Sequence, residues 1–338
     1  MGKDDCTISS GSKYIERQRG AVKLKYIIGI DIGGTNFRIG AVRDGLEEEM
    51  FEQKSSAAFH KENAVGFLME EVRNYISRYN LQGKIEAISI GVPSIVSKDK
   101  SFIYSTPNLK GLENIDLGHR MEEVLHIPVF IDRDVNYLLA HDIEKYQLDP
   151  DKEKTVLGFY LGTGFGNAVY INGKIHSGKN GVAGELGHIP MYNIEEKCPC
   201  GNYGCAELRC SGKYLSYLVE KHFPDIELPE VFVKYKEHEI IQKYIELLSY
   251  PMATEINILD PDYVLLAGGV IMMKEFPIEQ LKKEILKRTR KPYPAQNLTF
   301  ICTQHNQYSG VLGGATMAFA KMKQRIVTAK ECSSIIKN

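Results

Sequence analysis

Two stretches of the chain repeat the same pattern of apolar and polar positions. Residues 26–30 form a short apolar run, the glycine turn DIGGT follows, and residues 36–42 alternate like a second strand. Residues 155–160, the turn GTGFG and the stretch NAVYING repeat this order about 130 residues later. An apolar run, a glycine-rich turn and a second strand are typical of a β-hairpin. The sequence therefore predicts two hairpins, each of which opens one structural unit.

The rest of the chain alternates between helical and strand patterns. Val65, Leu68, Val72 and Ile76 form one apolar stripe at helical spacing, which predicts a helix over residues 63–79. The other predicted strands are 84–92, 129–131, 263–266 and 298–302, and the other predicted helices are 117–125, 135–146, 213–221, 229–257, 278–289 and 310–322. Strands that alternate with helices predict an α/β fold, and the repeated hairpin predicts two lobes with a cleft between them.

A length of 338 residues suits two domains, since a domain takes roughly 150 residues. We expect a polar tail over residues 1–24, a first lobe over 25–135 and a second lobe over 136–309. The second lobe contains a cysteine-rich loop at 188–210, and the final helix, 310–323, is expected to return to the first lobe.

Charge and hydropathy exclude several classes of partner. The chain has 42 basic and 43 acidic side chains, so it lacks the basic excess that predicts binding to nucleic acid or a membrane surface. No uninterrupted apolar stretch reaches the ~18 residues of a membrane-spanning helix. The first residues also lack the apolar centre of a signal peptide. We therefore expect a cytoplasmic protein, whose thiols stay reduced.

The two glycine turns can hold phosphate, because glycine lets backbone N–H groups approach an anion closely. Neither turn has the spacing of a P-loop or is followed by a helix as a dinucleotide-binding motif requires. Each turn alone is more often a simple tight hairpin, but the matched pair favours a nucleoside triphosphate held from both sides. Asp31 is a candidate ligand of Mg²⁺ or of its water shell. The turn residues concerned are Gly33, Gly34, Thr35, Thr163 and Gly164.

A carboxylate stands where a predicted strand passes into a helix, in the stretch IDRDVN. Asp134 is placed to be the N-cap of that helix, and this structural role is one interpretation. The other is a general base at the edge of a sheet, which accepts a proton from a hydroxyl that attacks a phosphoryl group. The spacing favours neither interpretation over the other. Asp132 is the weaker candidate base because it is expected to face the opposite side of the strand.

Cys198, Cys200 and Cys205 form a C-x-C-x4-C cluster, which predicts zinc binding rather than disulfides in a reducing compartment. Tetrahedral zinc needs a fourth ligand, and both His188 and Cys210 are available. A four-ligand site is structural, and its expected role is to fix the loop. Glu185 and Glu207 would then be held at the two ends of the loop, although the residues alone slightly favour ordinary surface positions for both.

The stretches DIGGT, GTGFG, GVAGELGH and CPCGNYGCAE, in this order, resemble the ROK family of repressors and sugar kinases. The resemblance covers roughly residues 25–322, and GVPSIVSKDK, STPNL and DRDVN are most similar to the D-allose kinases within the family. It implies a two-lobed actin-like ATPase (ribonuclease H-like) fold with an inserted zinc-binding loop, which closes on sugar and ATP. It also implies a homodimer.

The resemblance further implies individual roles. Asp134 would be the base that deprotonates the 6-hydroxyl of the sugar, and His188 would be the fourth zinc ligand. The residues implied to hydrogen-bond sugar hydroxyls are Asn108, Glu185, His188 and Glu207. The phosphates would lie against the two glycine turns and the adenosine near Gly268 and Gly269. Two positions depart from the usual pattern, because Arg133 replaces an asparagine that contacts sugar and Ser94 replaces a glycine. Arg133 is expected among the substrate-binding residues, in the place of that asparagine.

The implied activity is ATP- and Mg²⁺-dependent phosphorylation of a hexose at its 6-hydroxyl, with D-allose as the expected sugar. Another hexose kinase of the family, a glucokinase or an N-acetylmannosamine kinase, is the alternative. A sugar-sensing repressor is disfavoured, because the residues before the first predicted strand show no helix-turn-helix pattern.

Overall fold

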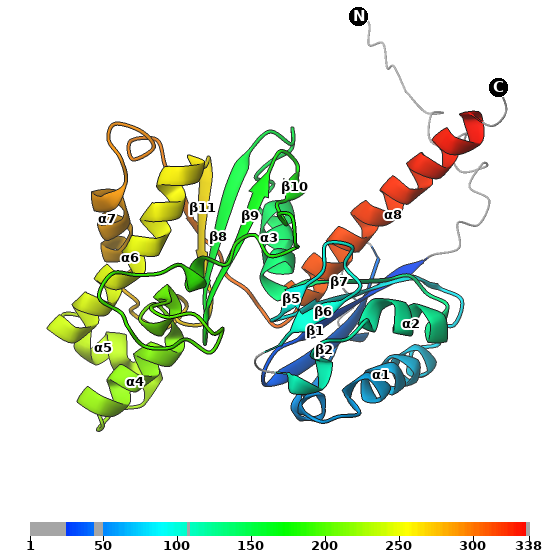
Figure 1. Ribbon diagram of the computed structural model, residues 1–338, viewed down its shortest axis with the longest axis horizontal. Coiled ribbons are helices and arrows are strands. Elements are labelled where there is room, and N and C mark those ends of the chain that lie inside the picture. The colour runs from blue at the N-terminus through cyan, green and yellow to red at the C-terminus, as the bar shows by residue number, and fades with distance from the viewer. Residues whose placement is uncertain (1–24, 44–49, 107–108, 336–338) are drawn as a thin grey trace, which may run out of the picture.

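The structure is a computed structural model that describes residues 25–43, 50–106 and 109–335, with side chains as far as residue 323. It has two lobes, each built on a five-stranded sheet (Figure 1). The first sheet has the order β3 (Glu52–Ser55), β2 (Asn36–Val42), β1 (Tyr26–Ile32), β4 (Ile85–Val92), β7 (Val129–Arg133). The second has the order β10 (Lys174–Ile175), β9 (Phe165–Ile171), β8 (Thr155–Leu161), β11 (Tyr263–Ala267), β12 (Thr299–Cys302).

The two sheets have the same strand order. If the strands of each lobe are numbered along the chain, this order is 3-2-1-4-5. The first two strands of each lobe pair antiparallel, so both predicted hairpins are confirmed. The fourth and fifth strands run parallel to the first. The two-lobed α/β fold predicted from the repeated pattern is therefore confirmed, and the two glycine turns occupy equivalent places in the lobes.

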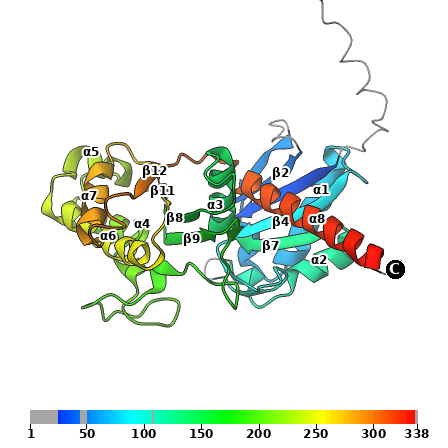
Figure 2. The same ribbon diagram turned by 90° about the horizontal axis from the view of Figure 1, so that it is seen from above.

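Helices cover both faces of the first sheet. α1 (Ala64–Arg78) and α2 (Leu117–Leu125) lie on one face, and α8 (Ser309–Ile335) crosses the other (Figures 1 and 2). The apolar stripe of α1 contributes Leu68 and Val72 to the core on its face. Val311, Ala315 and Ala318 of α8 pack on the opposite face. Burial of both faces explains why the central strands are apolar at successive positions rather than at alternate ones.

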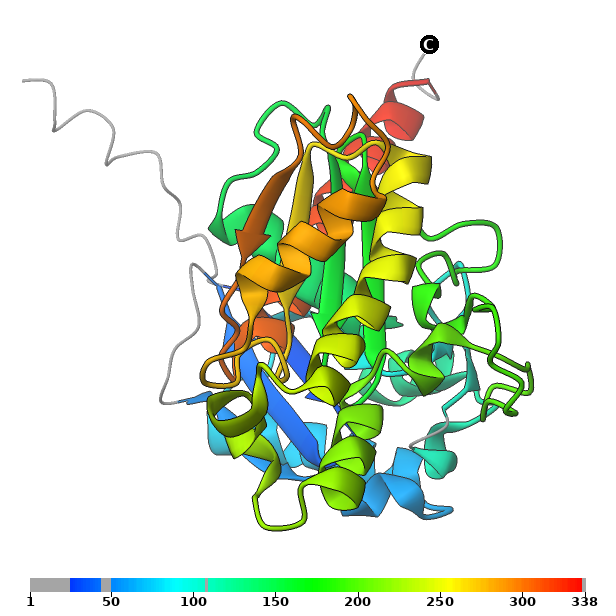
Figure 3. The same cartoon turned by 90° about the vertical axis from the view of Figure 1, so that its left-hand side faces the viewer.

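The second sheet is covered in the same way. Its outer face carries α4 (Gly212–His222), α5 (Val231–Tyr235), α6 (Glu239–Leu259) and α7 (Ile278–Arg288), and Figure 3 shows α6 in yellow and α7 in orange side by side over it. Leu157, Phe159 and Leu161 of β8 point into this core. Val156 and Tyr160 point to the other face, which α3 (Asp134–Lys145) covers.

α3 and α8 pack against each other between the two sheets, so these helices join the lobes. Two glycines of α8 allow the close approach, since a Cβ on Gly313 would lie 1.8 Å from the carbonyl oxygen of Tyr137. The chain between β12 and α8 is also fixed to α3. There, Nε2 of His305 lies 2.8 Å from Oδ1 of Asp142, a carboxylate with no solvent exposure. The residue at which the chain is best divided into domains stays a prediction.

Several elements differ from the sequence-based expectation. The helix expected over 229–257 is interrupted, because His238 has an extended backbone and its Nδ1 accepts a hydrogen bond from the Ile240 N–H at the start of α6. The final helix runs well beyond residue 322. The small sheet of β5 (Ile95–Val96) and β6 (Ile103–Ser105) was not predicted. Short 3₁₀ helices occur at Ala57–His60, Lys110–Leu112, Leu186–His188, Ala206–Leu208 and Leu228–Glu230. Within the described ranges, no helix is both long and apolar enough to cross a bilayer.

The contact between α3 and α8 leads to a stability prediction. Gly313→Ala would force a methyl group against the Tyr137 carbonyl, and we expect the free energy of unfolding to fall by about 1–3 kcal/mol, as overpacking does. The control is Gly66→Ala in the exposed part of α1, where the nearest atoms belong to the Asn63 side chain, which can move. This control should gain up to about 1 kcal/mol from its higher helix propensity. Urea unfolding measures both, and equal stabilities of the two variants would contradict the packing described here.

Candidate active site

The candidate site lies where the end of β1, the junction of β7 with α3 and the loop after β10 come together. Asp31 belongs to β1, Asp134 begins α3, and Glu185 belongs to the loop. The charges of Asp31 and Glu185 both act on Asp134, which places the three carboxylates close to one another. The site therefore gathers acidic groups from both lobes.

Asp134 is the first residue of α3 rather than its N-cap. Arg133 holds the cap position, because the extended backbone of β7 continues through it with φ −64° and ψ 137°. Oδ1 of Asp134 accepts a hydrogen bond of 2.8 Å from the Val135 N–H. The expectation that Asp134 caps the helix was one residue out, but its carboxylate still faces the positive end of the helix.

The surroundings of Asp134 give it the pKa of a base. Burial raises the pKa of this carboxyl to about 6, and the negative charge of Asp31 contributes further in the same direction. The Val135 N–H and the Arg133 guanidinium act against the rise. A carboxylate with a pKa near the working pH is ionised at neutrality and can still hold an accepted proton, which is what general-base catalysis requires.

The guanidinium group of Arg133 connects the two lobes. Nη1 donates to the Ala183 carbonyl at 2.7 Å, and Nη2 donates to the Gly184 carbonyl at 3.1 Å. Nη2 also lies 2.9 Å from Oε1 of Glu185, and the arginine side chain is only 8% exposed. Gly184 has φ +86°, and a Cβ there would lie 2.9 Å from the Asn167 carbonyl, so only glycine fits. Arg133 therefore holds the loop that carries Glu185.

His188 stands between Glu185 and the cysteines. Its Nε2 lies 3.7 Å from Oε2 of Glu185, and its Nδ1 lies 3.7 Å from Sγ of Cys198. Sγ of Cys200 lies 3.6 Å from Sγ of Cys205. His188, Cys198, Cys200 and Cys205 each offer one ligand atom, and these four atoms all lie within 4.8 Å of one another. Tetrahedral zinc with bonds of about 2.3 Å to sulfur sets its ligand atoms roughly 3.7 Å apart, so this group could hold zinc.

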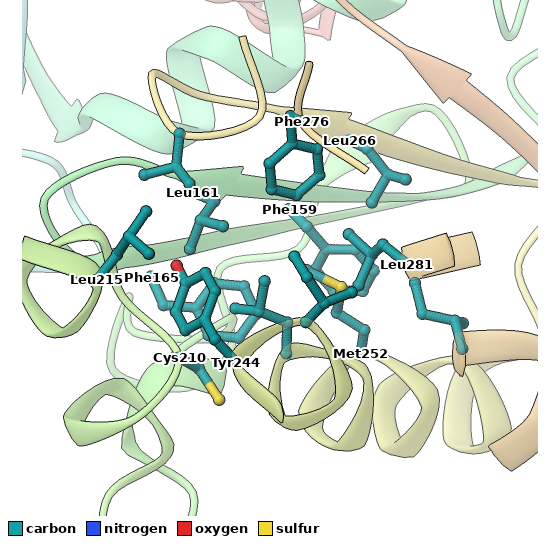
Figure 4. Close-up of a cluster of buried hydrophobic side chains, with 14 of the residues drawn as sticks. Phe159, Leu161, Phe165, Cys210, Leu215, Tyr244, Met252, Leu266, Phe276 and Leu281 are labelled. Atoms are coloured by element: carbon teal, nitrogen blue, oxygen red, sulfur yellow. The ribbon is translucent and has the colours of Figure 1, made fainter. Parts of the chain in front are cut away.

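Cys210, the competing ligand, lies elsewhere. It is fully buried in the core of the second lobe, and its Sγ lies 3.3 Å from the Leu247 carbonyl. Figure 4 shows it among these buried side chains next to Tyr244. Burial also raises the pKa of this thiol above the usual range. The geometry therefore groups His188, and not Cys210, with the other three cysteines.

Glu207 lies beside the second glycine turn. Its Oε2 accepts a hydrogen bond of 2.9 Å from the Phe165 N–H, at the start of β9. A Cβ on Gly164 would lie 2.6 Å from the same oxygen, so the glycine is needed for this approach. Glu185 and Glu207 are both partly buried and bonded, which disagrees with the expectation of ordinary surface positions for them.

The tips of both glycine turns are exposed to solvent, but different segments of the chain lie beside them. Gly34 and Thr35 are exposed at the tip of the first turn, which the Gly33 N–H closes by donating to the Asn36 carbonyl at 2.8 Å. Thr163 is exposed at the tip of the second turn. Its carbonyl accepts a hydrogen bond of 2.9 Å from the Lys213 N–H, so the start of α4 abuts this turn.

Gly268 and Gly269 follow β11, beside the second turn. Gly268 has φ +104°, and a Cβ on it would lie 2.5 Å from the Leu161 carbonyl. The Val270 N–H donates to the same carbonyl at 3.0 Å. The glycines therefore bring the chain after β11 against the end of β8, where the second turn begins.

Asp31 faces the start of α8. A Cβ on Gly310 would lie 2.9 Å from Cγ of Asp31, and Nη1 of Arg38 lies 2.9 Å from its Oδ2. Burial raises the pKa of the Asp31 carboxyl, against the opposing effect of Arg38. A half-buried carboxylate in this position could serve as a hard ligand for Mg²⁺ or its water shell.

One ion pair next to the site was not found from the sequence. Nζ of Lys100 lies 2.8 Å from Oδ1 of Asp132, and Asp132 has no solvent exposure. No local pattern in the sequence indicates this partner of Asp132. Asn108, which the resemblance implies as a sugar ligand, lies outside the described residues.

The comparisons with known proteins agree with this architecture. The N-acetyl-D-glucosamine kinase of Vibrio cholerae is 27% identical over 308 residues, which cover 85% of this chain and 97% of that protein. A ROK family glucokinase from Streptomyces griseus, solved with glucose and AMPPNP, superposes with a TM-score of 0.68 at 21% identity and covers 86% of this chain and 98% of its own.

The fold alone does not separate enzymes from regulators. A ROK family transcriptional regulator, a homolog of the E. coli MLC protein, superposes with a TM-score of 0.73 at 19% identity and covers 87% of this chain and 77% of its own. Residues 27–321 match the ROK family, which is most of the chain. The chain therefore belongs to the ROK family.

Proposed function

We propose that this chain is an ATP-dependent sugar kinase that transfers the γ-phosphoryl group of ATP to the 6-hydroxyl of a hexose. The observation that carries the proposal is the Asp134 carboxylate, half-buried at the start of α3 with a pKa raised to about 6, beside carboxylates from both lobes. Membership of the ROK family and the sugar kinases among its relatives support the same activity.

In the proposed reaction, Asp134 accepts the proton of the primary hydroxyl as the oxygen attacks the γ-phosphorus. General-base contributions of this kind amount to about 10²–10⁴-fold in rate. The ionised form dominates at neutral pH because the raised pKa still lies below 7. Phosphoryl transfer needs little covalent chemistry from the protein, so alignment of the hydroxyl with the phosphate is the other main contribution.

Glu185, His188 and Glu207 are proposed to bind the sugar hydroxyls. An ionised carboxylate accepts two or more hydrogen bonds, and a fixed pair of them can separate axial from equatorial hydroxyls. Arg133 holds Glu185 at 2.9 Å, so the array is rigid before sugar arrives. A site built around particular hydroxyls rejects an epimer because its own polar groups are then left unpaired.

ATP is proposed to lie between the two glycine turns, with the adenosine near Gly268 and Gly269. Backbone N–H groups of Gly34 and Thr35 would face the phosphates from the first lobe, on the turn that the Gly33 N–H closes, and Thr163 with Gly164 would face them from the second. Asp31 is the proposed carboxylate for Mg²⁺, which would neutralise part of the phosphate charge when bound.

We further propose that His188, Cys198, Cys200 and Cys205 hold a structural zinc ion. The spacing of their ligand atoms, all within 4.8 Å of one another, supports this. Zinc with four protein ligands supplies rigidity rather than catalysis. Ligation through Nδ1 would fix the tautomer of His188 and leave Nε2, 3.7 Å from Glu185, as a hydrogen-bond donor on the sugar side. The implied homodimer stays a prediction.

Two candidate sugars remain, supported by different observations. The names of the curated relatives favour N-acetyl-D-glucosamine or another common hexose. D-allose is supported only by the resemblance of the motifs GVPSIVSKDK, STPNL and DRDVN. The arginine at position 133, which is bonded to the loop at Ala183 and Gly184, indicates a sugar contact that differs from that of the usual asparagine. An ADP-release assay over a panel of D-allose, glucose, N-acetylglucosamine and N-acetylmannosamine decides between them. Release with none of the panel would favour a sugar-sensing protein without catalysis.

Removal of the proposed base should sharply lower turnover but leave sugar binding intact. In Asp134→Asn we expect kcat to fall by about 10²–10⁴-fold, while the Kd for sugar changes little. Asp151→Asn, at an exposed turn position, is the matched control and should keep full activity. Calorimetry with sugar and a coupled ADP assay supply the two measurements. A kcat near that of the control would refute the assignment of Asp134.

The pKa of Asp134 predicts the acid limb of the pH profile. The base acts in its ionised form, so activity is present above the pKa and is lost as the pH falls through about 6. We expect kcat/KM for the sugar to fall about tenfold for each pH unit below that value. Circular dichroism at each pH checks that the protein remains folded. A folded protein whose kcat/KM stays level down to pH 4.5 would show an unperturbed carboxylate and contradict the proposal.

The metal proposal is tested by removing one ligand. Cys200→Ser should lower metal affinity by at least about 10–100-fold and raise the KM for sugar, because His188 and the loop lose their support. Cys302→Ser, which removes another exposed thiol, is the control and should keep about one zinc ion per chain. Elemental mass spectrometry of the purified proteins gives the metal content. Equal zinc in both variants, or none in the unsubstituted protein, argues against the ligand set.

A further inference from the structure

A buried lysine stands at the edge of the candidate site. Lys100 belongs to the turn between β5 and β6, is only 7% exposed, and has φ +68°, a backbone conformation that glycine adopts far more readily. Its carbonyl accepts a hydrogen bond of 2.9 Å from the Ile131 N–H of β7. A lysine that is both buried and in a left-handed conformation is costly, so its side chain is expected to have a specific use.

The ammonium group of Lys100 binds the end of β7, next to the junction with α3 at which Asp134 lies. Oδ1 of Asp132 accepts from Nζ of Lys100 at 2.8 Å, from the Arg133 N–H at 2.8 Å and from Nδ2 of Asn136 at 2.7 Å. One carboxylate oxygen thus binds the last residue of β7 and the first turn of α3. Asp132 carries the only negative charge in this set, and Lys100 neutralises it where water is excluded.

The same ammonium group reaches the second lobe. Nζ of Lys100 lies 3.3 Å from Oγ of Ser177, which follows β10. The turn that carries Lys100 also contacts the chain after Ser177, because a Cβ on Gly181 would lie 3.2 Å from the Lys98 amide nitrogen and 2.3 Å from the carbonyl of Val96 at the end of β5. That chain leads directly to Ala183, Gly184 and Glu185, the loop that Arg133 holds.

We infer that Lys100 is a positioning residue, which ties the junction of β7 and α3 to the loop of Glu185 and so sets the base against the sugar. The inference rests on the proposed function, in which Asp134 is the base and Glu185 a sugar ligand. Lys100 does not itself touch the reactants. It acts through Asp132 on one side and through Ser177 on the other.

The ion pair could instead serve stability alone, and a set of variants separates the two roles. Lys100→Met keeps most of the side-chain volume, removes the charge and leaves Asp132 unpaired. The double variant Lys100→Met/Asp132→Asn removes both charges, so the buried site is neutral again, but the contact with Ser177 stays lost. Ser177→Ala removes only that contact. Lys98→Met, an exposed lysine on the same turn, is the matched control.

Three measurements are made on the full chain: urea unfolding, kinetics with each substrate varied in turn, and amide hydrogen exchange of residues 177–188. In Lys100→Met we expect lower stability, faster exchange of residues 177–188 and a loss in kcat/KM for sugar of about 10²-fold, the effect of a misplacement near 1 Å. The KM for ATP should stay unchanged, because Lys100 has no hydrogen bond to either glycine turn. The Lys98→Met control should match the unsubstituted protein in all three.

The double variant gives the decisive result. If Lys100 ties the lobes, neutralising Asp132 restores most of the stability but leaves the loss in kcat/KM and the fast exchange in place, and Ser177→Ala shows part of both defects. If kcat/KM and slow amide exchange were restored in the double variant together with stability, the inference would be overturned. Neutralising the buried charge would then be enough to explain the role of Lys100. Exchange and unfolding do not depend on turnover. They test whether Lys100 links the β7–α3 junction to the loop of Glu185 even if no hexose is phosphorylated. Failure of the proposed function and failure of this inference therefore remain distinct.

Discussion

The Arg133 guanidinium group is the contact on which the geometry of the site depends. It extends from the last residue of a strand in one lobe and binds two carbonyls and a carboxylate of a loop in the other. The next residue along the chain is Asp134, so the group that orients Glu185 is joined covalently to the candidate base. A planar fork with fixed donors suits this task, and lysine could not replace it because it lacks the paired geometry. Arg133 therefore links the start of α3, which carries Asp134, to the loop that carries Glu185 before any ligand binds.

The repeated architecture explains why these groups meet. Both sheets have the same strand order, and both open with an antiparallel hairpin whose turn is rich in glycine. α3 and α8 pack together between the sheets and so join the two lobes. Carboxylates from both lobes, those of Asp31, Asp134 and Glu185, lie close to one another at the candidate site. The cysteine cluster supports the remaining side, because His188 faces the cysteines with one ring nitrogen and Glu185 with the other.

Local patterns predicted the elements well, for a physical reason. A hairpin, an amphipathic helix or a strand-to-helix junction depends on neighbouring residues, so both glycine turns, α1 and the junction at Asp134 could be predicted from the sequence, the last to within one residue. The interruption before α6 was missed because it depends on the backbone at His238 and not on a glycine or proline. The sugar itself was not determined from the sequence, because the motifs most resemble D-allose kinases, whereas the N-acetyl-D-glucosamine kinase of Vibrio cholerae is among the curated relatives.

Contacts between distant segments could not be predicted in the same way. Lys100 and Asp132 are 32 positions apart, and only the small sheet of β5 and β6 brings them together. Arg133 meets a loop 50 positions later, so its departure from the usual asparagine suggested an altered sugar contact rather than a link between lobes. Spacing alone also left His188 and Cys210 equal as ligands, and only the packing of the second core separates them.

A crystal structure of the protein with a hexose that it phosphorylates and a non-hydrolysable ATP analogue tests the central claim most directly. The measured quantity is the distance from the Asp134 carboxylate to the primary hydroxyl oxygen of the sugar. The account predicts about 2.6–3.2 Å, the range in which a proton can be transferred, with the γ-phosphorus on the far side of that oxygen. A sugar bound elsewhere, or a carboxylate turned away from the hydroxyl in the complete complex, would contradict it.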